Sequence, residues 1–504
     1  MEISALKELI EKIKKEPLFE KDFYPQDAPS YKVFIHSEKI EPYLKERYSL
    51  KEIEFLSGLT LPAREIKIVS RPWGSFISAA SFDDSNKARF TNYDAVWIRD
   101  SLWGYLALKS NKETKQEAKE ILLTLFDYIV KQRGRILAAI ENPSRLDEAD
   151  GKMKAIHIRF DSNSASFDDV SENGKAQEWN HKQNDALGLL LDCGINALRD
   201  GVIDFEDLEK KDRFEMFIYL AAYLSAVKFY GMKDSGAWEE EEKLNSSSIA
   251  LVCSAFENLL NFLKENSLFC AKFTEFASKL NLEKCCAAEV LEKSLSEGYK
   301  ILKRQIELGG ESVLCGKKDP HYREADAALL NIIYPSKLSR LSFREREKVL
   351  NTVESLSGIF GIKRYEGDNY QAANFWFHNI KTDTDAKSIE ERKKHFICGS
   401  EAEWFFDSWF SLCCLKLYQE SKEKRFLERA FRYLNRALGQ ITGADAIGAD
   451  GKKVPSFCLP ESYNFLICAR QKYAAASPII PLNWAKASLS LMFKEFKNQG
   501  KTDE

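Results

Sequence analysis

The sequence predicts an all-α protein whose helices pair around one core as an α/α toroid. Apolar residues recur at positions i, i+3, i+4 and i+7 along most of the 504 residues. Successive helical segments are joined by short polar turns, and strand-like alternation of apolar and polar residues is sparse. Because no linker rich in Gly, Ser or Pro divides the chain, one core is favoured over separate bundles.

The helical spacing of apolar residues recurs along the whole length of the chain. An amphipathic, charged helix is expected over residues 1–23. Further helices are expected over residues 101–109, 114–132, 183–198, 213–231, 246–265, 287–307, 325–334, 342–356, 409–420, 424–438 and 481–496. Short strands are expected only in connecting loops, within residues 30–36 and 152–160.

Charge and hydropathy exclude several classes of partner. The chain has 74 basic and 77 acidic residues, and its formal net charge is −3. This near-balance offers no field that would attract nucleic acid or an anionic membrane. No apolar run approaches the roughly 20 residues of a membrane span. We therefore expect neither nucleic acid nor a membrane as partner, and the oligomeric state stays open.

Cysteine and histidine usage gives no sign of a metal centre. The eleven cysteines include no CxxC pair, and most lie in apolar helical segments, which is typical of reduced cysteines in a core. The six histidines lack metal-ligand spacing, so no metal is expected. The first residues show neither the apolar region nor the cleavage site of a signal peptide. These features lead us to expect a cytoplasmic protein.

Most of the nine tryptophans lie where predicted helices begin, beside charged and amide residues. These junctions hold Trp97, Trp179, Trp238, Trp376, Trp404 and Trp484. In a ring of helical hairpins the inner helices all open on one face, so the junctions should meet in one pocket. Aromatic faces stack on the C–H faces of sugars, while Asp, Arg, Gln and Asn match sugar hydroxyls. The pocket therefore favours a carbohydrate, and its carboxylates suit acid–base catalysis.

Each junction taken alone also fits ordinary structure. Residues 97–100 fit a helix N-cap with a packed indole, and residues 179–185 fit a helix start. The acidic run 239–242 fits a solvated first helical turn, where the helix dipole favours negative charge. Glu461 fits a loop carboxylate. Only their joint order separates the functional interpretation from the structural one.

Six segments follow one another in a fixed order between about residues 70 and 495. They are YDAVWIRDS (93–101), WNHKQND (179–185), GAWEE (236–240), ADAALL (325–330), RYEGDNY (364–370), and LPES (459–462) with PLNW (481–484). Together they resemble the motifs of glycoside hydrolase family 15, the glucoamylase-type enzymes, and of the related N-terminal domains of phosphorylase kinase regulatory subunits. Six collinear motifs are far more specific than any one of them.

The resemblance implies a fold and a domain organisation. It implies an (α/α)6 toroid of the six-hairpin glycosidase type, with few short strands in its loops. Residues 71–504 would form the glucoamylase-like catalytic domain, and residues 1–70 an N-terminal helical extension packed on the toroid. It implies no cofactor.

The resemblance also implies a role for each matched residue. Glu239 would be the general acid that protonates the glycosidic oxygen, and Glu461 the general base that activates water on the opposite face. In an inverting enzyme the two carboxyls stand roughly 6.5–9.5 Å apart, which leaves room for that water. Glu240 would bind the departing sugar.

The remaining matched residues would bind substrate. Arg99 and Asp100 would hold hydroxyls of the terminal glucose, and Arg364 those nearer the scissile bond. Further substrate-binding positions are Tyr93 near the water, the stacking walls Trp97 and Trp179, and Gln183, Asp185, Trp238, Asp368 and Trp484.

These features predict an inverting, exo-acting glycoside hydrolase that releases glucose from the non-reducing ends of short α-glucans, such as maltodextrins or glycogen-derived oligosaccharides. A hydrolase of trehalose or isomaltose is one alternative. A catalytically silent glucan-binding regulatory subunit, like those of phosphorylase kinase, is another. The pair Glu239 and Glu461 favours catalysis. A helical-repeat scaffold would not explain the tryptophans at the helix starts.

Overall fold

The computed structural model describes residues 3–26, 29–82, 92–109, 111–172, 174–377 and 389–500. Within these ranges, helical elements alternate along the chain between an outer and an inner layer. The outer layer consists of α2 (Leu50–Leu59), α6 (Lys115–Lys131), α11 (Glu215–Ala226), α15 (Ala288–Leu308), α16 (Phe343–Glu354) and α20 (Lys424–Gly439). The inner layer consists of α5 (Ile98–Leu108), α9 (Asn184–Arg199), α12 (Ser246–Glu265), η5 (Ala327–Ile332), α19 (Asp407–Ser421) and α21 (Asn483–Gly500).

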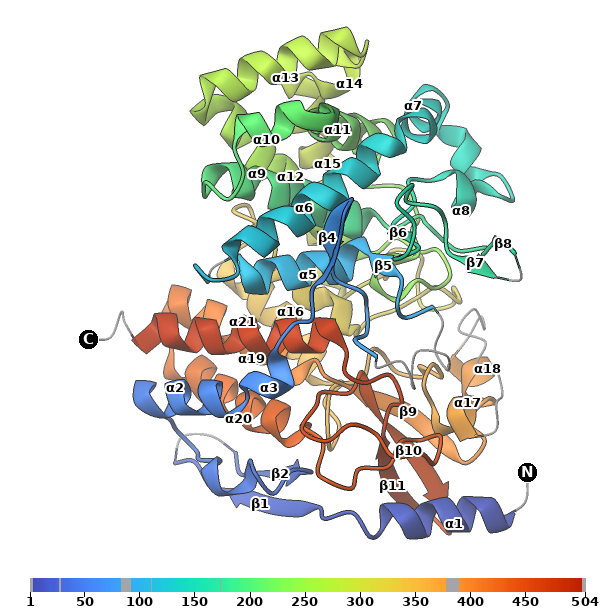
Figure 1. The fold of residues 1–504 in the computed structure, drawn as a ribbon, viewed down its shortest axis with the longest axis vertical. Coiled ribbons are helices and arrows are strands. Elements are labelled where there is room, and N and C mark those ends of the chain that lie inside the picture. The colour runs from blue at the N-terminus through green and yellow to red at the C-terminus, as the bar shows by residue number, and fades with distance from the viewer. Residues whose placement is uncertain are drawn as a thin grey trace.

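The inner elements form a closed ring. Each packs on the next in chain order, and the last, α21, lies beside the first, α5 (Figure 1). Each outer helix packs on an inner neighbour, with α6 on α5, α15 on α12 and α20 on α19. The predicted (α/α)6 toroid is therefore confirmed. The element η5 is a 3-10 helix where an α-helix was expected, over 325–334.

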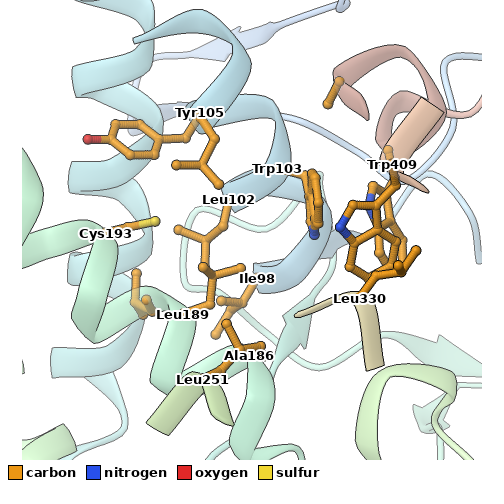
Figure 2. Packing of buried hydrophobic residues seen from close by; sticks show 14 of the residues in the cluster. Ile98, Leu102, Trp103, Tyr105, Ala186, Leu189, Cys193, Leu251, Leu330 and Trp409 are labelled. Carbon is orange, nitrogen blue, oxygen red and sulfur yellow. The ribbon is translucent and has the colours of Figure 1, made fainter. Parts of the chain in front are cut away.

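The core fills the space between the inner helices (Figure 2). The residues labelled there are Ile98, Leu102, Trp103 and Tyr105 from α5, Ala186, Leu189 and Cys193 from α9, Leu251 from α12, Leu330 from η5 and Trp409 from α19. All of them are buried. Five inner elements thus share one apolar centre, which explains why the helices of this layer are apolar on most sides.

The helix α12 has the length and apolar composition of a membrane span, the one such helix in the part of the chain that the structure describes. However, 78% of that stretch is buried within the protein, as in the core helix of a toroid. The short helices α13 (Ser267–Lys279) and α14 (Glu283–Cys286) pack against α11, which explains the burial of all sides of α11.

The N-terminal residues supply the outer helix α2 and a two-stranded sheet that packs on the outer layer. The helix α1 (Ile3–Ile13) is shorter than the helix expected over 1–23, and residues Phe19–Phe23 form strand β1 instead. This strand pairs antiparallel with β2 (Tyr31–Ile35), and β2 packs on α20. The helices α2 and α3 (Leu61–Arg64) pack on α21. A boundary between an extension and a catalytic domain near residue 70 stays a prediction.

The strands are short and lie in the connections. The largest sheet has the antiparallel order β11-β10-β9, built from β9 (Gly399–Trp404), β10 (Ser462–Cys468) and β11 (Gln471–Ala476). Two-stranded pairs are β3 (Val69–Arg71) with β4 (Gly74–Phe76), β5 (Val96–Trp97) with β6 (Arg159–Phe160), and β7 (Ser171–Glu172) with β8 (Lys175–Ala176). Strands were expected within 30–36 and 152–160, where β2 and β6 lie, but not in the three-stranded sheet.

The remaining helical turns decorate the toroid. They are η1 (Glu41–Tyr43), α7 (Arg133–Glu141), η2 (Pro143–Asp147), α8 (Gly151–Lys154), α10 (Phe205–Glu209), η3 (Lys210–Asp212), η4 (Gly236–Trp238), α17 (Ala373–Phe377) and α18 (Ile389–Lys393). Of these, η4 matters most for the site, because it ends directly before Glu239.

Candidate active site

A cavity of about 340 Å³ lies where the inner elements begin. Its lining includes ten of the residues predicted for the site, namely Tyr93, Trp97, Arg99, Asp100, Trp179, Trp238, Glu239, Arg364, Glu461 and Trp484. The rest of the lining is Ala79, Asn92, Arg159, Ala237, Tyr370, Trp404, Phe405, Phe406 and Leu482. Side chains from distant parts of the chain thus meet at one end of the helical ring.

Local structure explains this convergence. Trp97 ends strand β5 and directly precedes α5, so Arg99 and Asp100 occupy the first turn of an inner helix. In the same way, Trp484 lies in the first turn of α21, and Phe406 precedes α19. The first turns of α5 and α21 and the residues directly before α19 therefore meet at the cavity.

Arg99 organises one wall of the cavity. Its Nε donates to Oδ2 of Asp185 at 2.7 Å, and its Nη2 donates to Oε1 of Gln183 at 2.6 Å. The same Nη2 also donates to the carbonyl oxygen of Gly236 at 3.1 Å, and Nη1 lies 3.3 Å from Oε1 of Glu239. Gln183 and Asp185 lie behind the lining, where they fix the arginine that faces the cavity.

Glu239 has an uncommon backbone conformation for a residue with a side chain. It adopts the left-handed region, with φ 61° and ψ 37°, directly after η4. Such a conformation persists only where the surroundings enforce it, and it is often found at functional sites. The indole Nε1 of Trp97 lies 3.4 Å from Oε2 of Glu239, so Trp97 and Arg99 each hold one carboxylate oxygen.

A second arginine and its partners form another wall. Arg364 donates from Nε and Nη2 to both oxygens of Asp368 at 2.7 Å, and from Nη2 to Oε1 of Glu240 at 2.9 Å. Oε2 of Glu240 accepts from Arg323 at 3.2 Å. Burial alone would raise the pKa of Glu240, but the cations Arg364, Arg323 and Lys243 together hold it below its usual range.

Glu461 lies directly before β10 and is buried. Burial raises the pKa of its carboxyl to about 8, and the negative charge of Asp100 adds to the rise. Arg364 and hydrogen bonds from Gln371 and Tyr93 oppose that rise. A carboxyl with this pKa titrates near neutral pH, and its ionised form is a stronger base than an ordinary carboxylate.

Two tyrosines lie close to both carboxyls. The hydroxyls of Tyr93 and Tyr370 are hydrogen-bonded to each other. Burial raises the pKa of both tyrosines, and the charges of Glu461 and Glu239 raise it further. The charges of Glu239 and Glu461 therefore both raise the pKa of the same two hydroxyl groups within one cavity.

Residues 63–408 match the glycosyl hydrolases family 15. The chain belongs to this family. Five of its six motifs contribute side chains to the cavity lining, and the sixth, 325–330, supplies Asp326, which accepts a hydrogen bond from the lining residue Trp238 at 2.7 Å. The predicted family is therefore confirmed, and a glycoside hydrolase is the function class that membership supports.

Solved structures support the same fold at low sequence identity. A glucoamylase from Saccharomycopsis fibuligera is 15% identical, with a TM-score of 0.53, over 95% of this family 15 chain and 99% of the glucoamylase chain. A solved glycosidase is 14% identical, with a TM-score of 0.51, over 89% of this chain and 96% of its own. At such identities the likeness is one of fold.

Two proteins of Escherichia coli K12 are more similar in sequence. The lipoprotein YgeQ is 48% identical over 213 residues, which are 42% of this family 15 chain and 81% of YgeQ. The protein YgeP is 41% identical over 97 residues, which are 19% of this chain and 98% of YgeP. The name lipoprotein contradicts our prediction of a cytoplasmic protein, which is wrong by this comparison.

The prediction of a cytoplasmic protein rested partly on the reduced cysteines, but their burial in the core is enough to explain why they occur. Cys193, Cys253, Cys286, Cys413 and Cys414 are all buried and free. Burial raises the pKa of each thiol, which keeps the reactive thiolate rare. Such cysteines act as small apolar core residues, so their presence does not report the redox compartment.

The structure separates the predicted site residues of this family 15 protein into three groups. Ten line the cavity, whereas Gln183, Asp185 and Asp368 lie outside its lining and hold the arginines. Glu240 lines an adjoining groove that shares Trp179 and Glu239 with the cavity. Within the described ranges, no group of three or more His, Cys, Asp or Glu side chains is arranged to hold a metal ion.

Several lining residues were not predicted as site residues. Tyr370 lay within a segment that the sequence singled out, so its position could have been found, whereas Trp404 was expected in the pocket as one of the junction tryptophans and does line it. Trp376 was expected in the pocket, but it lies outside the lining and donates from Nε1 to Gln371 at 3.3 Å. Arg159 has no motif around it and belongs to the short strand β6. Its place in the cavity follows from the pairing of β6 with β5.

Proposed function

We propose that this chain is an inverting, exo-acting glycoside hydrolase that releases glucose from the non-reducing ends of short α-glucans. The observation that carries the proposal is the meeting of Glu239 and Glu461 in one cavity lined by tryptophans and arginines. Glu239 would protonate the departing oxygen, and Glu461 would take a proton from the attacking water. The raised pKa of Glu461 makes its ionised form the stronger base, which acts where the pH is high enough to ionise the carboxyl.

Unpartnered indole groups support a sugar as the ligand. The indole Nε1 atoms of Trp179, Trp404 and Trp484 are buried and have no hydrogen-bond partner among the described residues. All three side chains line the cavity. Buried donors are normally satisfied. Sugar hydroxyls are acceptors that would satisfy them, while the indole faces pack on the C–H faces of the ring.

A proton NMR time course with maltotetraose tests the proposal. We expect β-glucose to be released first from this α-linked substrate, since an inverting enzyme reverses the anomeric configuration. Glu239→Gln and Glu461→Gln should each lower the rate by about 10³-fold or more. Glu366→Gln is the control, because Glu366 belongs to one of the six motifs but lies outside both the cavity and the adjoining groove.

Other outcomes would redirect or refute the proposal. Early α-glucose would contradict the inverting geometry, and full activity of both glutamine variants would contradict the site. Release of glucose from isomaltose or trehalose, and not from maltotetraose, would identify that disaccharide as the substrate. Sugar binding without any release would favour a glucan-binding regulatory subunit.

The name of YgeQ suggests a location. We propose that this chain acts outside the cytoplasm, held at a membrane or in the periplasm. Cell fractionation with antibody detection tests this, with markers for the cytoplasm, the periplasm and the membranes. Recovery with the cytoplasmic marker would contradict it.

A further inference from the structure

Arg159 differs from the other buried arginines around the cavity in having no acidic partner. Arg99 pairs with Asp185, Arg364 with Asp368, and Arg323 with both Asp326 and Glu240. Arg159 is only 2% exposed, yet no carboxylate of the described residues lies within salt-bridge distance of it.

The guanidinium of Arg159 is held by neutral groups. Its carbon Cζ lies 3.7 Å from the ring centre of Trp179 and 5.3 Å from that of Trp97. Its Nη2 donates to Oε1 of Gln177 at 2.6 Å, and its Nη1 is a buried donor without a partner in the part of the chain described. A buried charge is costly unless an opposite charge meets it.

The acidic residues whose charges reach Arg159 are Glu239, Asp169 and Glu172, and none of them lies within salt-bridge distance of it. In the adjoining groove, Glu178 pairs with Lys152 at 3.2 Å, Glu241 with His321 at 3.2 Å, and Glu242 with Lys182. Glu239 pairs with Arg99. Burial lowers the pKa of Arg159 to about 10, which agrees with an incompletely balanced cation.

The position of Arg159 indicates which part of a substrate it would meet. It stacks on Trp179, which lines both the cavity and the groove, as does Glu239. If Glu239 protonates the departing oxygen, the groove lies on the side of the departing sugar. Arg159 then lies at the boundary between the reacting glucose and the sugar that leaves.

We infer that Arg159 recognises an anionic group, a carboxylate or a phosphate, on the sugar that departs. The inference rests on the proposed function and adds a substrate class to it. An oxyanion there would accept hydrogen bonds from the guanidinium and neutralise its charge, a strong interaction in a buried site. A neutral glucan would leave the charge unmatched.

Isothermal titration calorimetry of three disaccharides tests the inference. All carry a glucose linked α-1,4 to a second ring, which is glucose, glucuronic acid, or glucose with a phosphate on C6. The protein carries Glu461→Gln so that turnover does not interfere. We expect one of the two anionic disaccharides to bind about 10-fold more tightly than the neutral one. Which of them does so identifies the source of the anion.

Variants of Arg159 separate recognition from a structural role. Arg159→Gln should reduce the ratio of anionic to neutral affinity to about one, and Arg159→Lys should keep part of it because the charge remains. If Arg159 had a purely structural role, Arg159→Gln would lower the affinity for both kinds of disaccharide equally and leave the ratio of affinities unchanged. Lys272→Gln is the control, because it removes a cation that is paired with Glu209 and lies outside both the cavity and the groove.

The results also distinguish this inference from the proposed function. Equal affinities in the parent protein, or a preference that persists in Arg159→Gln, would overturn the inference. Hydrolysis of maltotetraose by the wild-type chain would then still support the proposed function. If none of the three disaccharides binds and no α-glucan is hydrolysed, both fail.

Discussion

The side-chain amide of Gln371 donates a hydrogen bond to the carboxylate of Glu461. Gln371 is itself fixed on several sides, since its Oε1 accepts from Ser477 at 2.6 Å and from Ser462 at 3.2 Å. Like Glu239, it adopts a left-handed backbone, with φ 59°. A constrained residue therefore positions the proposed general base from behind the cavity lining.

Removal of this hydrogen bond should change the pH dependence of hydrolysis. The bond favours the charged form of Glu461 and lowers its pKa. Without it, the pKa should rise further above its ordinary value, and the base should become active only at higher pH. Gln371→Leu should move the acidic limb of kcat/KM to higher pH by about one unit.

The measurement is a pH profile of kcat/KM with maltotetraose. Trp376→Phe is the matched control, because it removes a donor to Gln371 but leaves the amide free to donate to Glu461. Its acidic limb should stay close to that of the wild type. An unchanged profile in Gln371→Leu would show that Glu461 does not govern the acidic limb.

Glu461 should also lower the stability of the fold at alkaline pH. Its folded-state pKa of about 8 lies above the ordinary value, so the folded protein holds this proton more tightly than the unfolded chain. The resulting stabilisation is full below the ordinary pKa of 4.5, is lost progressively as the pH rises from there to about 8, and changes no further at higher pH. Glu461→Gln removes the buried negative charge and should become increasingly favourable across that interval.

Urea unfolding at several pH values measures this effect. Between pH 6 and pH 9 the stability of Glu461→Gln relative to the wild type should rise by about 2 kcal/mol. Glu241→Gln, at a partly exposed carboxylate, should follow the wild type throughout. A constant difference between Glu461→Gln and the wild type would mean that Glu461 is not the group that titrates.

The sequence predicted the toroid because helical periodicity is a local property. Each inner and outer helix carries its own apolar face, so segments such as 246–265 could be recognised without knowledge of their neighbours. The 3-10 helix η5 was harder, because all six of its residues are buried, the polar Asn331 included, and no exposed position reveals a period. Strand β10 is similar, since its first five residues are all buried.

Candidate site residues were predictable where a motif surrounded them. Glu239, Arg99 and Trp97 lie together in the cavity, as the order of their motifs indicated. Arg159 and Gln371 could not be predicted in this way. Arg159 reaches the cavity through the pairing of β6 with β5, and Gln371 reaches Glu461 across 90 residues of sequence. Both contacts are non-local.

The ion pair of Arg99 with Asp185 should be essential to stability as a pair. Both side chains are buried, with exposures of 5% and 1%. Arg99→Leu leaves the buried charge of Asp185 unmet and should cost about 3–5 kcal/mol in the free energy of unfolding. The double variant Arg99→Leu with Asp185→Leu should recover much of that loss. Urea unfolding of the four proteins in this cycle measures the coupling, and strict additivity would contradict it.

The close approach of α9 and α12 should tolerate no side chain at Gly188. A Cβ atom there would lie 2.8 Å from the backbone nitrogen of Val252 and 2.9 Å from the carbonyl carbon of Leu251. Because backbone atoms cannot rotate away, two inner helices would have to separate. We expect Gly188→Ala to cost about 2–3 kcal/mol in the free energy of unfolding.

Gly58 gives the opposite expectation for the same substitution. It lies in the outer helix α2, and a Cβ atom built there has no neighbour within 4 Å. Since alanine favours the helical conformation more than glycine does, Gly58→Ala should stabilise the protein by up to about 1 kcal/mol. Urea unfolding of both variants measures the contrast. Equal effects at the two positions would contradict the close packing of α9 on α12, and with it the geometry that holds Asp185 under Arg99.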